Sequence, residues 1–162
     1  MKVRSTLISI LAATTVALAS HPARAADTGS ATPAAADTLA EVRTQIAAKN
    51  WSGAIAALQR VNESASADWN NLMGYSLRQQ ATPDLEGAER FYNAALRIEP
   101  RHRGALEYSG ELYLQKGDLA KAEQRLAALD KACLLGCEQY TDLKKAIERY
   151  KAAGNKYLAT TY

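Results

Sequence analysis

The sequence predicts an all-α fold built from stacked helix pairs, and three observations lead to this prediction. Similar residues recur at an interval of 34 along the chain. Within each recurring segment, the apolar residues follow the spacing of one helix face. No segment alternates apolar and polar residues as a half-buried strand would. A sequence period of this length is typical of proteins that stack one helical unit on the next.

The interval of 34 residues links several positions. Ala54, Ala88 and Ala122 are separated by it. It also separates Leu58, Tyr92 and Leu126; Val61, Ala95 and Leu129; and Trp51, Leu85 and Leu119, the last three preceded by Asn50, Asp84 and Asp118. Four sets that each recur three times indicate a true repeat.

The first helix pair begins at a predicted capping box. Thr38 and Glu41 have the required spacing, so we expect a helix over 38–49. A second helix follows Asn50, a residue type that caps helix starts. Its expected apolar face is formed by Trp51, Ile55, Leu58 and Val61.

The second pair is predicted over 67–80 and from Pro83 onward. Thr82 is the expected cap of the later helix, with the proline in its first turn. The third pair is predicted over 102–116 and after Asp118.

A last helix is predicted over 138–153, and Gly154 ends it. Its outer face is expected to carry Glu138, Lys144 and Lys151. Its apolar stripe is formed by Tyr140, Leu143, Ile147 and Tyr150.

Two segments resemble the tetratricopeptide (TPR) pattern, W-x2-L-G-x2-Y followed by A-x3-F and P. One is Leu106-x2-Ser109-Gly110-x2-Tyr113 with Ala122-x3-Leu126. The other is Asn70-x2-Met73-Gly74-x2-Leu77 with Ala88-x3-Tyr92, Ala95 and Pro100. The first pair departs from the pattern, because Arg43 takes the small-residue place.

The resemblance covers residues 38–153 and implies a TPR-type α-α superhelix of three helix pairs plus a C-terminal capping helix. The domain would span 37–154, with repeats at about 38–66, 67–102 and 103–136. Gly74 against Ala88, and Gly110 against Ala122, would let paired helices approach closely.

The resemblance also implies a partner-binding groove, lined by the first helix of each pair. By register, its predicted lining is Asn71, Tyr75, Arg78, Gln79, Glu107, Glu111, Gln115, Lys145 and Arg149. The first pair would add only Ala40, Thr44 and Ala47. For each polar residue the alternative is a merely solvated helix face. Tyr75 is the preferred anchor, because exposed aromatic residues often anchor bound peptides.

The N-terminal segment has the layout of a secretory signal peptide. Lys2 and Arg4 precede an apolar run of about 14 residues, and Ala23-Arg24-Ala25 forms a small-x-small cleavage site. The run is short for crossing a hydrocarbon core of ~30 Å, although an N-terminal anchor remains the alternative. We therefore expect a signal peptide over 1–25, a leader over 26–36, a tail over 155–162, and a periplasmic or secreted protein without a stable membrane anchor.

Charge and motifs argue against several functions. The formal net charge is +3, but cleavage leaves 17 of the 20 basic residues beside 17 acidic ones. A nucleic-acid partner is not expected, since such proteins carry a basic excess. His102 is the one histidine after residue 25 and is expected at a helix start on the surface. Neither a metal-ligand cluster nor a catalytic motif is present, so we expect no cofactor, no metal and no catalysis.

Cys133 and Cys137 admit three interpretations. In an oxidising compartment two nearby cysteines usually form a disulfide, which is the favoured one. A redox-active pair is less favoured, because those motifs are C-x-x-C beside a βαβ unit. Free thiols or intermolecular pairing are the third.

The functional hypothesis is therefore an adaptor or assembly factor that holds a partner protein or peptide in its groove. Glu107 and Glu111 would repel a carboxylate, so capture of a partner's C-terminus is not expected. A self-associating structural module, a possible homo-oligomer, is the alternative. An enzyme or a thiol-redox protein ranks third.

Overall fold

The computed structural model describes residues 37–158, which contain seven helices and no strand. The predicted signal peptide and leader, and the end of the tail, lie outside the described residues. For the part described, the all-α prediction is confirmed. The helices are α1 (Ala40–Ala47), α2 (Trp51–Val61), α3 (Ala67–Arg78), α4 (Leu85–Ile98), α5 (Arg103–Gln115), α6 (Leu119–Ala132) and α7 (Glu138–Ala152).

Three helices start in the same way, at the residues that the interval of 34 relates. Asn50, Asp84 and Asp118 cap α2, α4 and α6. Each side chain accepts a hydrogen bond from the backbone N–H three residues ahead, over 3.1, 2.8 and 3.0 Å. Such a bond satisfies one of the backbone donors that a helix start leaves unpaired.

Two predicted caps are wrong. Thr82 and Pro83 precede the start of α4, because Asp84 takes the capping position. Thr38 does not cap α1 either, since the Asp37 carboxylate accepts from the Leu39 N–H over 3.1 Å. A carboxylate is favoured there because it also interacts with the positive end of the helix dipole.

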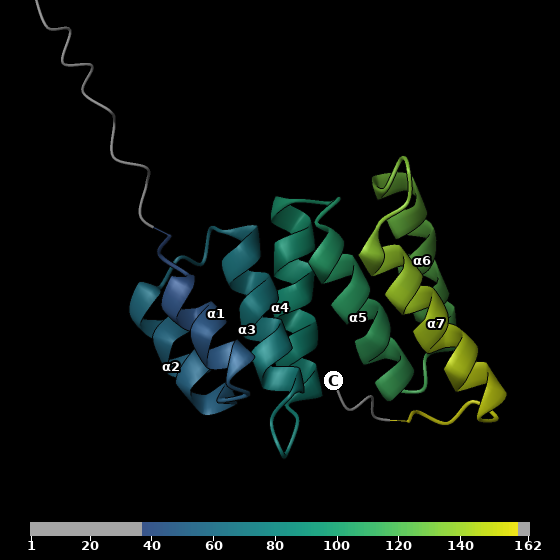
Figure 1. Cartoon of the computed structure of the whole chain (residues 1–162), viewed down its shortest axis with the longest axis horizontal. Coiled ribbons are helices and arrows are strands. Elements are labelled where there is room, and N and C mark those ends of the chain that lie inside the picture. The colour runs from purple at the N-terminus through teal and green to yellow at the C-terminus, as the bar shows by residue number, and fades with distance from the viewer. Residues whose placement is uncertain (1–36, 159–162) are drawn as a thin grey trace, which may run out of the picture. The chain divides into compact units, whose positions relative to one another are not determined.

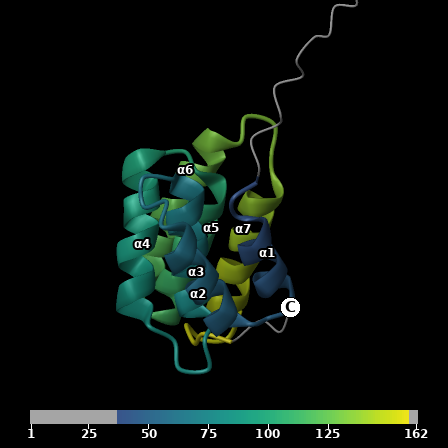
Figure 2. The ribbon, with the colours of Figure 1, turned by 90° about the vertical axis from the view of Figure 1, so that its left-hand side faces the viewer.

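The helices pack as antiparallel neighbours in chain order: α1 with α2, α3 with α4, and α5 with α6 (Figure 1). Successive pairs meet through α2 with α3 and α4 with α5, while α3 also touches α5. α7 packs on α5 and α6. Figure 2 shows α4 and α6 on one side of this row of helices and α1 and α7 on the other.

The core follows the predicted repeat. Ala54, Ala88 and Ala122 are all fully buried, and so are Leu58 and Tyr92. Small residues at these positions let helix backbones approach, as close packing requires. None of the described helices has the length and apolar character needed to cross a membrane.

The close approach at Gly74 is confirmed, and at Gly110 the nearest atoms belong to α7. A Cβ on Gly74 would lie 3.1 Å from the Ala88 carbonyl oxygen and 2.9 Å from the Tyr92 ring. A Cβ on Gly110 would instead meet the Leu143 side chain of α7 at 2.5 Å. The glycine on α5 therefore makes room for a side chain of the last helix.

Candidate functional site

Several residues predicted to face solvent in a groove are buried. Arg78 is 3 % exposed, Glu111 4 % and Asn71 5 %. The alternative of a merely solvated helix face therefore does not apply to these three residues, because neighbouring helices cover them. Gln79 and Gln115 are partly buried, whereas Lys145 and Arg149 on α7 are exposed.

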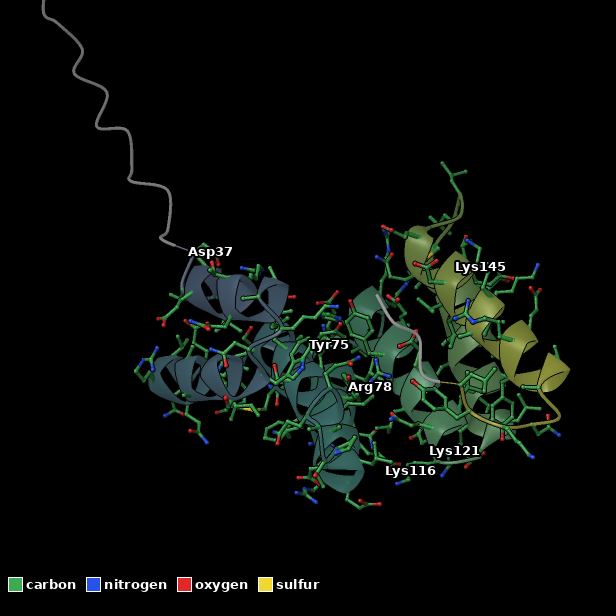
Figure 3. All side chains as sticks on the ribbon, turned by 60° about the horizontal axis from the view of Figure 1, so that its bottom comes forward. Asp37, Tyr75, Arg78, Lys116, Lys121 and Lys145 are labelled. Carbon is green, nitrogen blue, oxygen red and sulfur yellow. A yellow bond between two sulfur atoms is a disulfide. The ribbon has the colours of Figure 1, made fainter. Side chains whose placement is uncertain are left out.

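Arg78 and Glu111 form an ion pair that joins α3 to α5. The Arg78 Nη2 donates to Glu111 Oε2 over 2.7 Å. Leaving either charge alone in the interior would cost several kcal/mol, so the two residues depend on each other. Arg78 lies near Tyr75 in the middle of the described helices (Figure 3). The two side chains therefore stabilise the packing of α3 against α5, and neither charge needs a bound ligand to balance it.

Three aromatic rings run from α2 across α3 to α5, and we call Trp51, Tyr75 and Tyr108 the aromatic row. The rings of Trp51 and Tyr75 meet edge to face at 5.8 Å between centroids, and those of Tyr75 and Tyr108 lie 4.6 Å apart. All three side chains are partly exposed. Burial raises the pKa of Tyr75 and of Tyr108, so both phenols stay neutral. The preferred anchor, Tyr75, is thus the middle member of a partly exposed apolar strip.

Beside this row lies an open pocket of about 340 Å³ between α5 and α7. We call it the acidic pocket, because four of its seven lining residues are acidic. Its lining residues are Tyr75, Glu107, Tyr108, Glu111, Glu138, Gln139 and Asp142. It brings together three of the predicted groove residues with one end of the aromatic row.

Glu138, Gln139 and Asp142 are the lining residues that the sequence analysis missed. Glu138 was expected on the outer face of α7, and this is wrong, because α7 turns its first residues towards α5. The sequence does contain a pattern that indicates the position of two of these residues. Glu138 and Asp142 are four apart and therefore share a helix face, next to the apolar stripe through Leu143.

The carboxyl group of Glu107 is in the least favourable environment of the pocket. Burial, followed by the nearby charges of Glu111, Asp142 and Glu138, raises its pKa to about 8. Arg78 opposes this rise. Glu107 is 8 % exposed, and within the described residues it makes no hydrogen bond or ion pair. It therefore stands in the pocket wall without a counter-ion.

The other predicted lining residues lie away from the acidic pocket. Lys145 is on the exposed side of α7, 3.9 Å from Asp142 (Figure 3). Arg149 lies with Glu111 and Tyr157 around a separate small pocket, where the C-terminal tail returns to the helices. Asn71 Oδ1 and Gln115 Oε1 are buried with no hydrogen-bond partner among the described residues. The accessible part of the predicted groove is thus the acidic pocket with the aromatic row.

The cysteines and the histidine sit at helix ends. The sulfur atoms of Cys133 and Cys137 lie 2.03 Å apart, the distance of a disulfide, across the turn from α6 to α7. His102 caps α5: its Nδ1 accepts from the Ala105 N–H, and its Nε2 lies 3.0 Å from Asp68 Oδ1. Within residues 37–158, no group of three or more histidine, cysteine or acidic residues is placed to hold a metal ion.

Comparisons with protein-family models, with curated proteins and with solved structures find no match to this chain. The acidic pocket and the aromatic row are therefore the features of this chain that bear on its function.

Proposed function

We propose that this protein is a TPR-type helical-repeat adaptor that holds a segment of a partner polypeptide against the aromatic row and the acidic pocket. The observation that carries the proposal is the aromatic row itself. Trp51 and Tyr108 are partly exposed rings that each contact the partly exposed ring of Tyr75, and tyrosine and tryptophan are enriched among the residues that contribute most to binding at protein interfaces.

The repeat supports the TPR-type part of the proposal. Three helices begin with the same cap at residues related by the interval of 34, and the first helices α3 and α5 are neighbours. In repeat proteins of this kind, adjacent equivalent helices form one extended binding surface. The aromatic row and the acidic pocket both use residues of α3 and α5.

The place of action proposed is the periplasm or the outside of the cell. The predicted signal peptide over 1–25 supports this, although it lies outside the described residues. The paired cysteines are a second support, since disulfides persist in oxidising compartments.

Self-association is the second candidate, and one observation favours it. Leu134 and Leu135, in the turn between α6 and α7, are 85 % and 100 % exposed. Exposed apolar residues at a loop tip are suited to burial against another molecule. A second copy of this chain would bury them without using the aromatic row.

Site-specific photo-crosslinking in the source cells separates the two. A photoreactive amino acid would replace Gln139 in the acidic pocket, Leu135 in the turn or Arg90 on α4, one at a time. We expect a crosslink to a different protein from position 139 and none from position 90, which is exposed on a helix that does not line the pocket. A product of twice the chain's mass from position 135 alone would support self-association. Crosslinks from position 90 alone would contradict both.

A further inference from the structure

We infer that the acidic pocket binds a lysine or arginine side chain of the partner polypeptide. This inference rests on the proposed function and specifies the partner's chemistry. The observation behind it is Glu107, a residue only 8 % exposed whose side chain lines the pocket without a hydrogen bond or ion pair among the described residues. A buried carboxyl group usually has a partner, so this one points to a ligand.

The other three acidic residues of the pocket differ in whether a cation of the chain pairs with them. Glu111 is engaged by Arg78 of α3. Asp142 has Lys145 at 3.9 Å, on the exposed surface, where such a pair is weak. Glu138 makes no ion pair within the described residues. Among residues 37–158 no cation lines the pocket, and a ligand of positive charge would complement Glu107 and Glu138 together.

The pocket wall also suits the apolar stem of a basic side chain. Tyr75 and Tyr108 form one side, with their rings 4.6 Å apart. Lysine and arginine lay their methylene groups along apolar surfaces while the charged head reaches polar groups. A cation near a tyrosine face gains further attraction.

The aromatic row indicates that the cation belongs to a polypeptide. A free amine would fill the pocket and leave Trp51 and the outer face of Tyr75 unused. A peptide with its basic side chain in the pocket would lay neighbouring residues along these rings, which lead away from the pocket towards α2. The pocket would then set the register, and the row would add affinity.

Binding of a cation should also change the protonation of Glu107. With its pKa near 8 the free carboxyl group is mostly neutral at pH 7, and an ammonium or guanidinium group beside it favours the carboxylate. The proton is then released to solvent, so affinity should rise with pH between about 6 and 8. The charged and titratable groups that face Glu107 are Tyr75 and Arg78 of α3, Tyr108 and Glu111 of α5, and Glu138 and Asp142 of α7.

The test uses a degenerate library of capped peptides, retained on the immobilised chain and then sequenced. We expect enrichment of lysine or arginine at one position, and aromatic or aliphatic residues beside it. Enrichment without a basic position would overturn the inference while leaving the adaptor proposal intact. Retention of no peptide would count against both. Free arginine and spermidine form a separate arm, and binding of either as tight as that of the enriched peptide would identify the ligand as a small cation instead.

Two substitutions test the site directly. Glu107→Gln and Glu138→Gln should each weaken binding of the enriched peptide about tenfold, as expected when a charge-assisted hydrogen bond is lost. Glu138 is exposed, so its replacement leaves the fold intact. The matched control is Glu148→Gln, which makes the same change on the exposed side of α7 outside the pocket. Equal binding by all three variants and the wild type would place the cation elsewhere and overturn the inference.

Discussion

Glu107 shows how the fold sets the protonation of a single residue. Burial, together with the charges of Glu111, Asp142 and Glu138, raises its pKa from an ordinary 4.5 to about 8. A group whose folded pKa is raised contributes stability that is fully present below its unfolded pKa. That contribution is lost as pH rises through the folded pKa. The free energy of unfolding should therefore fall between about pH 4.5 and pH 8 because of this residue.

We accordingly expect Glu107→Gln to stabilise the protein in mildly alkaline solution. Glutamine has nearly the same shape and carries no charge, so the penalty of ionising a buried group disappears. The rise of the pKa from 4.5 to about 8 corresponds to ~5 kcal/mol at most, since each pKa unit corresponds to ~1.4 kcal/mol, so the gain should be largest at about pH 8.5 and fall below ~1 kcal/mol near pH 5. Thermal unfolding at both pH values measures it.

The control for this prediction is Glu148→Gln, at an exposed position of α7. Its melting temperature should follow that of the wild type at both pH values. A Glu107→Gln variant that is less stable than the wild type at both would show that Glu107 accepts a hydrogen bond on which the fold depends. Burial would then not be what raises the pKa of Glu107.

At the scale of the helix pair, stability depends on small residues where backbones approach. Ala88 is fully buried, and its carbonyl oxygen lies 3.1 Å from the place of a Cβ on Gly74. We expect Ala88→Leu to lower the free energy of unfolding by about 1–3 kcal/mol or more, because the added methylene groups must push α3 and α4 apart. Chemical denaturation followed by circular dichroism measures this loss.

Ala127→Leu is the matched control, since Ala127 is exposed on α6 and the change is chemically the same. Its midpoint of unfolding should stay within the small range usual for surface substitutions, about 0.5 kcal/mol. If Ala88→Leu is no more destabilising than this control, close packing of helices is not the reason that alanine recurs at positions 54, 88 and 122.

Local signals made most of the helices predictable. Asn50 and Asp118 cap the helices expected of them, because a cap acts over three residues and can be found in a short stretch of sequence. The buried registers through Ala54 and Leu58 follow from helical spacing in the same way. The cap expected at Thr82 lies at Asp84, because both residue types cap helices and only the backbone path decides between them.

The acidic pocket was predictable only in part. Glu107 and Glu111 were placed near Tyr75 because all three lie on first helices of consecutive pairs. The pairing of Arg78 with Glu111 joins residues 33 apart, and no local pattern distinguishes it from two solvated side chains. Glu138 was placed on the wrong face, since the rotation of α7 depends on how Leu143 packs against Gly110.

For the whole molecule, charge acts through local arrangement and not through a net field. If residues 1–25 are removed, basic and acidic residues balance at 17 each. Long-range attraction of a charged partner is then weak, and exposed charges are screened beyond about 8 Å at physiological salt. Selectivity for a basic partner would have to come from the acidic pocket itself, where four carboxyl groups face one space.

Export of the chain and formation of the Cys133–Cys137 disulfide are expected to occur together, because disulfides persist in oxidising compartments. If the protein is exported, we expect intact mass spectrometry of the material outside the cytoplasm to show a chain that begins at Ala26. Its mass should be lower than that of the reduced chain by two hydrogen atoms, since Cys133 and Cys137 would be bonded. Thiol labelling of the unfolded, unreduced protein should find no free cysteine.

A chain that retains Met1 would contradict export by cleavage, whereas a cleaved chain with two labelled thiols would contradict only the disulfide. A product that reductant converts from dimer to monomer would assign the cysteines to an intermolecular bond, and self-association would then replace the adaptor as the favoured function.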